Sequence, residues 1–141
     1  MTSTYFLGAN SAQGFYSLYG GFPPRSGFLH IIKGGPGTGK SGFMRAIGSE
    51  AEQRGMDVEY VLCSGDPDSL DGVYIPALNE AWVDGTAPHA LDPTIFGVTG
   101  DYVNLGRFCR TPFSSENQVA IRRITPAYKA LYAEGYEHIE A

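Results

Sequence analysis

An eight-residue run rich in glycine is the part of the sequence best suited to chemistry. Gly34-Gly35-Pro36-Gly37-Thr38-Gly39-Lys40-Ser41 matches the P-loop pattern G-x-x-x-x-G-K-[ST] at every position. Glycine permits the positive φ angles and close approach with which backbone N–H groups surround phosphates. Lys40 would bridge the β- and γ-phosphates as a catalytic residue, and the Ser41 hydroxyl would bind Mg²⁺. The motif predicts that all eight residues contact a purine triphosphate.

The segments on either side of this run must position it. Residues 27–32 form a continuous apolar segment, as expected of a strand buried on both faces of a parallel sheet. After the run, Phe43, Ile47 and Ala51 recur every four residues, which predicts a helix from Lys40 to Arg54 with these three residues on one face. The helix N-terminus would add partial positive charge beneath the phosphates.

Two acidic groups are candidates to assist the metal and the reaction. P-loop enzymes hold Mg²⁺ between the loop hydroxyl and an aspartate at the end of a neighbouring strand. Asp84 follows a predicted strand at residues 80–83 and is the preferred metal ligand. The alternative is Asp66 or Asp68, which follow a predicted strand at residues 58–63 and would reach the same sheet edge. These two are also the catalytic candidates to position water or a second substrate, although both groups also fit ordinary turns.

One histidine and four arginines are further candidates for contacts with the phosphates. His89 could approach the terminal phosphate, but a loop histidine without such a role is more common. His30 alternates with apolar neighbours and is expected to be a hydrogen-bonded core residue. A calcium loop starting at Asp66 is excluded, because Asp71 stands where glycine is required. Arginines that could contact a transferring phosphoryl group are Arg107, Arg110, Arg122 and Arg123.

The remaining patterns predict one α/β domain over residues 1–141, with a P-loop NTPase core at about 1–106 and a helical part at 107–141. A strand at residues 5–7 and a short helix around residues 15–19 precede the buried strand. Ser115 and Gln118 form a capping-box pattern for a late helix, and Thr125-Pro126 is expected to end it and start another. We expect a mostly parallel sheet with flanking helices.

Charge and composition narrow the setting. The net charge of −5 argues against a general nucleic-acid binder. From Gly55 to Gly106 there is no lysine or arginine but there are nine carboxylates, a composition better suited to a metal than to an anion. No apolar run has the length of a signal peptide or a membrane span, and Cys63 and Cys109 are expected to be reduced. These features predict a soluble cytoplasmic protein with no membrane partner.

Four segments together resemble a known family: residues 5–10, the run Gly34–Ser41, residues 63–72 and residues 84–93. The family consists of bacterial proteins labelled ATPase or ATP-binding protein, whose members carry two similar P-loop halves in tandem. The likeness covers residues 5 to 106, and the chain looks like the first half with its C-terminal part cut short. The resemblance implies nucleotide binding, with hydrolysis as an expectation and a second P-loop half, or another copy of the chain, as a partner.

Three functions fit these patterns. Mg²⁺-dependent binding and hydrolysis of ATP is the first, because the loop also looks like that of RecA-like and AAA-type ATPases. Those enzymes place a glutamate directly after the strand-end aspartate, where this chain has Gly85. A small-molecule or nucleotide kinase is the second, and a nucleotide sensor without hydrolysis is the third. ATP is preferred to GTP because the sequence contains neither Asn-Lys-x-Asp nor Asp-x-x-Gly.

Overall fold

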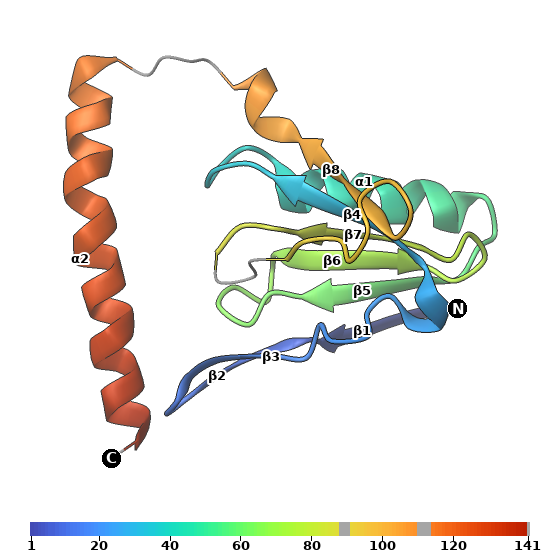
Figure 1. Cartoon of the computed structure of the whole chain (residues 1–141), viewed down its shortest axis with the longest axis horizontal. Helices are drawn as coiled ribbons and strands as arrows, with labels where there is room; N and C mark the ends of the chain where they lie inside the picture. Colours follow the sequence, from blue (N-terminus) through green and yellow to red (C-terminus); the bar gives the residue numbers. More distant parts are fainter. Residues whose placement is uncertain (88–90, 110–113, 141) are drawn as a thin grey trace.

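A six-stranded, mostly parallel sheet forms the centre of the computed structural model, which describes residues 1–87, 91–109 and 114–140 (Figure 1). Within this sheet β6 runs antiparallel to both neighbours. The chain is therefore an α/β protein, as the sequence predicts. In spatial order the strands are β1 (Thr2–Phe6), β5 (Val58–Leu62), β6 (Leu70–Ile75), β7 (Glu80–Asp84), β4 (Phe28–Lys33) and β8 (Gly100–Asn104).

The five parallel strands end at one edge of the sheet, and this edge collects the polar residues. The glycine-rich run follows β4 there, and Asp84 is the last residue of β7, the direct neighbour of β4. Because β6 is reversed, its first residues, Leu70 and Asp71, lie at the same edge. The predicted strands at residues 27–32, 58–63 and 80–83 are thus confirmed, whereas β6 and β8 were not predicted.

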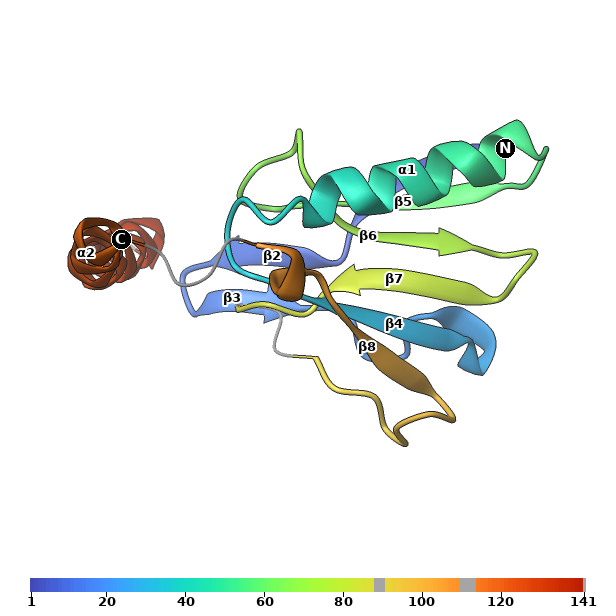
Figure 2. The same ribbon diagram turned by 90° about the horizontal axis from the view of Figure 1, so that it is seen from above.

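Helix α1 (Lys40–Gln53) covers one face of the sheet (Figure 2). The predicted helix is confirmed. Of the three residues predicted to share one face, Ala51 is buried and Ile47 is partly buried against the core. Met44, Gly48 and Ala51 are buried, whereas Phe43 is 36% exposed. Gly48 packs so closely on β5 that an added Cβ would lie 2.4 Å from the ring of Tyr60. Because glycine has no side chain, the spacing of apolar residues does not identify Gly48 as a contact residue.

The opposite face is covered by a loop instead of a helix. Tyr19 packs there with Ile31, Val61 and Val83 from the central strands. The short helix predicted around residues 15–19 is wrong, because a hairpin of β2 (Gly8–Ser11) and β3 (Gly14–Ser17) lies in this region, followed by the 3-10 turn η1 (Pro24–Ser26). Gly14 has φ 95° and accepts a hydrogen bond from the Ser11 hydroxyl. This turn chemistry outweighs a helical spacing carried by only three residues.

The C-terminal part is one long helix, α2 (Ser115–Glu140), preceded by the 3-10 turn η2 (Leu105–Phe108). The predicted break at Thr125-Pro126 is wrong, since Pro126 lies inside the helix and the Thr125 hydroxyl donates to the Ile121 carbonyl at 2.8 Å. Ser114 caps the helix in place of Ser115, because its Oγ accepts from the Asn117 N–H.

Helix α2 stands at the edge where the parallel strands end (Figures 1 and 2). The Tyr136 hydroxyl donates to Asn10 Oδ1 on β2 at 2.9 Å. Within the described ranges neither helix combines the length and apolar character needed to cross a membrane.

Candidate functional site

The glycine-rich loop joins β4 to α1 and turns sharply at two glycines. Gly37 and Gly39 have φ angles of 75° and 86°, which residues other than glycine rarely adopt. Gly39 is also the N-cap of α1 and supplies no side-chain cap. The first turn of α1 therefore has no side-chain acceptor at its N-cap, which leaves its N–H groups available to a ligand.

The first half of the loop is held by contacts within the chain. The Thr38 hydroxyl donates to the Gly35 carbonyl at 2.8 Å, and the Thr38 N–H donates to the same oxygen at 3.3 Å. A Cβ on Gly34 would lie 2.6 Å from Thr38 Oγ1 and 3.5 Å from the Gly106 nitrogen. A side chain at position 34 would therefore clash with Thr38 of the same loop, and it would also contact the turn that follows β8.

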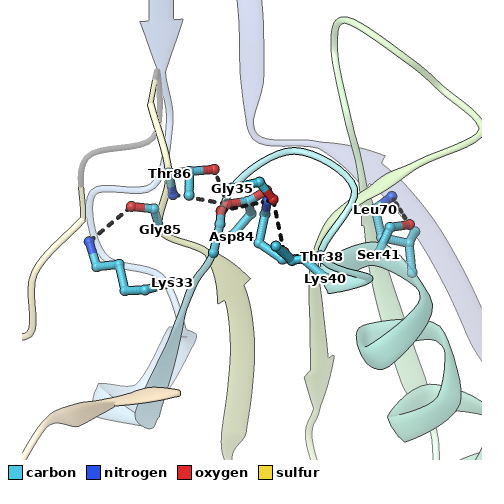
Figure 3. A network of polar contacts seen from close by, with 10 residues as sticks. Lys33, Gly35, Thr38, Lys40, Ser41, Leu70, Asp84, Gly85 and Thr86 are labelled. Atoms are coloured by element: carbon cyan, nitrogen blue, oxygen red, sulfur yellow. Dashed lines mark hydrogen bonds and ion pairs between the residues drawn. The ribbon is translucent and has the colours of Figure 1, made fainter. Parts of the chain in front are cut away.

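Lys40 points back toward the loop (Figure 3). Its ammonium donates to the carbonyls of Gly34 and Gly35 at 2.9 and 3.0 Å. It also lies 3.7 Å from Asp84 Oδ2, with the two side chains only 11% and 16% exposed. The motif lysine and the preferred metal aspartate, 44 positions apart in the sequence, are thus brought together.

The backbone after Asp84 leaves no room for a larger residue. Gly85 donates its N–H to the Ile32 carbonyl at 2.9 Å, which continues the pairing of β7 with β4. A Cβ on Gly85 would lie 2.2 Å from Ile31 Cγ2. The glutamate that many ATPases carry at this position is therefore sterically excluded here. Thr86 completes the turn by donating its N–H and its hydroxyl to Asp84 Oδ1.

Ser41 lies in the first turn of α1, on the other side of the loop from the Lys33–Gly85 contact in Figure 3. Its Oγ accepts a hydrogen bond from the Leu70 N–H at 2.9 Å. This contact fixes the hydroxyl near the start of β6 and leaves the oxygen with a second lone pair.

Asp66 and Asp68 lie in the exposed turn between β5 and β6. Both carboxylate oxygens of Asp66 bind this turn, one accepting from the Asp68 N–H and the other from the Ser69 hydroxyl at 2.8 Å. Arg45 of α1 donates to the Asp68 carbonyl at 2.8 Å. The structure thus places Asp66 and Asp68 in a turn, which is the ordinary structural role that their sequence also fits.

Asp71 is the residue of this edge that the sequence analysis did not single out. It is 4% exposed and lies beside the thiol of Cys63, with which it hydrogen-bonds. Burial raises the pKa of Cys63. Burial also raises the pKa of Tyr19, and the charges of Asp71 and Asp84 add to this effect. The available signal was a single carboxylate inside the otherwise apolar run Leu70–Ile75, all of which is buried.

The other candidates lie elsewhere. His30 bonds to Asp101 at 2.7 Å and stacks on Trp82 in the middle of the sheet, so it is partly buried and hydrogen-bonded as expected. Arg122 and Arg123 are exposed on α2. Arg107 lies in η2, next to Gly106. His89 and Arg110 lie outside the described residues.

Among the described residues there is no cluster of three or more His, Cys, Asp or Glu side chains that could hold a metal ion. Comparison with protein-family models, with curated proteins and with solved structures gave no match.

Proposed function

We propose that the chain adopts a P-loop NTPase fold and performs Mg²⁺-dependent binding and hydrolysis of ATP. The observation that carries the proposal is the approach of Lys40 to Asp84, whose charged groups lie 3.7 Å apart. Lys40 begins the helix that follows β4, and Asp84 ends the adjacent parallel strand β7. A lysine under a glycine-rich loop beside a strand-end aspartate is the arrangement that positions the phosphates and the metal of a nucleoside triphosphate.

Phosphate binding follows from the charges and donors of the loop. Lys40 now donates to two loop carbonyls, which are neutral acceptors. Charged phosphate oxygens are stronger acceptors, so the ammonium exchanges these partners when a triphosphate binds. The left-handed glycines and the N-terminus of α1 direct N–H groups to the same place.

The residues at this edge fit a magnesium ion. Ser41 offers a hydroxyl and Asp84 a carboxylate, and Mg²⁺ prefers such hard oxygen ligands together with phosphate oxygens and water. Thr86 orients the Asp84 carboxylate through two hydrogen bonds to Oδ1. When bound, Mg²⁺ would neutralise phosphate charge. These two groups fill only part of the coordination shell of Mg²⁺, so the ion should bind tightly only together with the triphosphate.

Hydrolysis should be slow. Gly85 replaces the glutamate that would activate water, and the packing of Ile31 prevents a larger residue there. The kinase alternative gains support from one observation: Asp84, which lies 3.7 Å from Lys40, also lines a cavity together with Asp71. We also expect ATP to bind more tightly than GTP, because the guanine-reading sequence is missing.

The direct test is calorimetric titration of MgATP into the parent chain, Lys40→Ala and the matched control Lys33→Ala. Lys33 is a suitable control because it lies at the end of β4, just before the loop, and its ammonium donates to the carbonyls of Gly85 and Leu91 instead of to the loop. Loss of a charge-assisted contact to phosphate costs about 1.5–3 kcal/mol, so Lys40→Ala should weaken binding by at least about tenfold. Lys33→Ala should bind nearly as tightly as the parent. Equal affinity in the parent and Lys40→Ala would refute the proposal.

A further inference from the structure

A cavity of about 470 Å³ lies beside the glycine-rich loop, between the sheet edge and α2. Asp71 at the start of β6 and Asp84 at the end of β7 line one side, and Tyr128, Tyr132 and Tyr136 of α2 line the other. The residues of the loop do not line it. Its volume falls within the range of about 300–1,000 Å³ that is usual for small-molecule sites, and it is separate from the predicted phosphate cradle.

The aromatic side of the cavity is a continuous stripe. Tyr128 and Tyr132 have ring centroids 4.9 Å apart, and the Tyr132 and Tyr136 centroids are 6.2 Å apart. The stripe meets the sheet edge at two points. Tyr136 bonds to Asn10, and a Cβ on Gly65 would lie 3.4 Å from the Tyr132 hydroxyl. The neighbouring rings are tilted by 57° and 56° to each other, so a flat ring could stack on the face of one of them.

The acidic side connects the cavity to the loop. Asp84 lines the cavity and also lies 3.7 Å from the ammonium of Lys40. A molecule in the cavity is thus separated by one carboxylate from the lysine that would hold the terminal phosphate. Asp71 is buried next to Asp84, near the start of strand β6, all of whose residues are buried. Asp71 lies where the register of β5 and β6 shifts, between the paired residues Leu70 and Gly72. A buried carboxylate held by the strands on both sides can accept a hydroxyl proton.

We propose that this cavity binds a small alcohol with a flat ring, uncharged or cationic, and that its hydroxyl accepts the γ-phosphoryl group of MgATP. The proposal rests on the proposed ATP site and names the second substrate of that site. The hydroxyl oxygen bonds to the γ-phosphorus while the bond to the β,γ-bridging oxygen breaks. That electron pair leaves with ADP, and the hydroxyl proton passes to Asp71 and then to water.

The charges of the cavity define the class of alcohol. Asp71 and Asp84 contribute two carboxylates and Lys129 one ammonium to the lining, and the ammonium of Lys40 lies 3.7 Å from Asp84. Asp71 is therefore the carboxylate that would repel an anionic acceptor such as a nucleoside monophosphate, whereas a nucleoside has the ring, the hydroxyls and no charge. Nucleosides and their 5′-monophosphates are therefore a matched pair of probes that differ in charge.

The experiment measures phosphoryl transfer from MgATP to the four common ribonucleosides and to their 5′-monophosphates, with products identified by mass spectrometry. Calorimetry measures nucleoside binding without ATP. At least one nucleoside should be phosphorylated, and its monophosphate should react at least about tenfold less efficiently. Asp71→Asn should lower the transfer rate by about 100-fold or more, as expected for loss of a general base, with MgATP affinity within about twofold of the parent.

A second pair of variants tests the cavity without touching a buried charge. Ala133 lines the cavity, so Ala133→Phe should fill it and weaken nucleoside binding by at least about tenfold. Ala127 faces a different hollow of α2, and Ala127→Phe should bind as the parent does.

Three results would overturn the assignment: no nucleoside bound or phosphorylated, equal binding by the parent and Ala133→Phe, or faster reaction of the monophosphates. MgATP binding without nucleoside binding refutes the cavity assignment alone. Absence of MgATP binding in the parent refutes the proposed function and the transfer step together.

Discussion

Replacing Asp84 with asparagine should separate ATP binding from Mg²⁺. The amide keeps the shape of the side chain but removes its charge, and Thr86 can still donate to the remaining carbonyl oxygen. Two interactions then change. The proposed metal loses its carboxylate ligand, and Lys40 loses the anion that lies 3.7 Å from its ammonium.

The size of the second change can be worked out from the structure. Two unit charges at this distance attract by about 4 kcal/mol when the effective dielectric constant is near 20. The desolvation of both side chains, which are 11% and 16% exposed, offsets most of this attraction. A net value of about 1–2 kcal/mol makes Lys40 easier to detach from Asp84 by a factor of about ten. ATP without metal should therefore bind Asp84→Asn about tenfold more tightly than the parent.

The assay is a calorimetric titration of ATP in EDTA and across a series of Mg²⁺ concentrations, with Asp66→Asn as the matched control. In the parent and in Asp66→Asn, ATP should bind more tightly in Mg²⁺ than in EDTA. In Asp84→Asn the ratio of these two ATP affinities should be at least about tenfold smaller. If Asp66→Asn removes the Mg²⁺ effect and Asp84→Asn keeps it, the metal aspartate is Asp66. If neither variant changes it, Ser41 and the phosphates hold the ion without a carboxylate.

Two further predictions concern the packing around the site. Gly85→Ala places a Cβ against buried Ile31 and should lower the free energy of unfolding by about 1–3 kcal/mol in urea titrations, and an unchanged midpoint would contradict the close packing. Tyr19→Phe should reduce the loss of stability in alkali, because the raised pKa of buried Tyr19 keeps it neutral in the fold while the unfolded phenol ionises above about pH 10. Above about pH 10 the parent should lose up to about 1.4 kcal/mol of unfolding free energy per pH unit because of Tyr19. The unfolding free energies of the parent, Tyr19→Phe and the exposed control Tyr16→Phe are measured at pH 8 and pH 11. Identical losses in Tyr19→Phe and Tyr16→Phe would refute the argument.

The elements next to the loop were predictable because each depends on local sequence. The apolar run before Gly34 has the length and composition of a buried strand, and β4 is observed there. Helix α1 follows from its periodic apolar residues, although Gly48 shows that a glycine can be the residue in closest contact. The approach of Lys40 to Asp84 was predictable from the motif together with the rule that parallel strands end at one edge.

The elements that were missed depend on partners far away in the sequence. Strand β8 contains Gly100, Asp101 and Asn104, which disfavour a strand locally, and pairing with β4 overrides this preference. The carboxylate of Asp66 holds the turn before β6 through two hydrogen bonds, which its sequence pattern also allowed. Pro126 is tolerated inside α2, although the sequence reading treated it as a helix start.

The reversed direction of β6 explains how the chemistry of this edge could extend beyond the loop. A parallel strand brings only its last residues to the carboxyl edge, so a carboxylate at its first positions would lie at the opposite end of the sheet. Because β6 is antiparallel, Asp71 begins a fully buried strand and still reaches the edge where β7 ends with Asp84. One carboxylate then faces both Lys40 and the cavity, while the other lines the cavity without being one of the proposed metal ligands. Substitutions at Asp84 should accordingly change both ATP binding and acceptor binding, whereas substitutions at Asp71 should change acceptor chemistry alone.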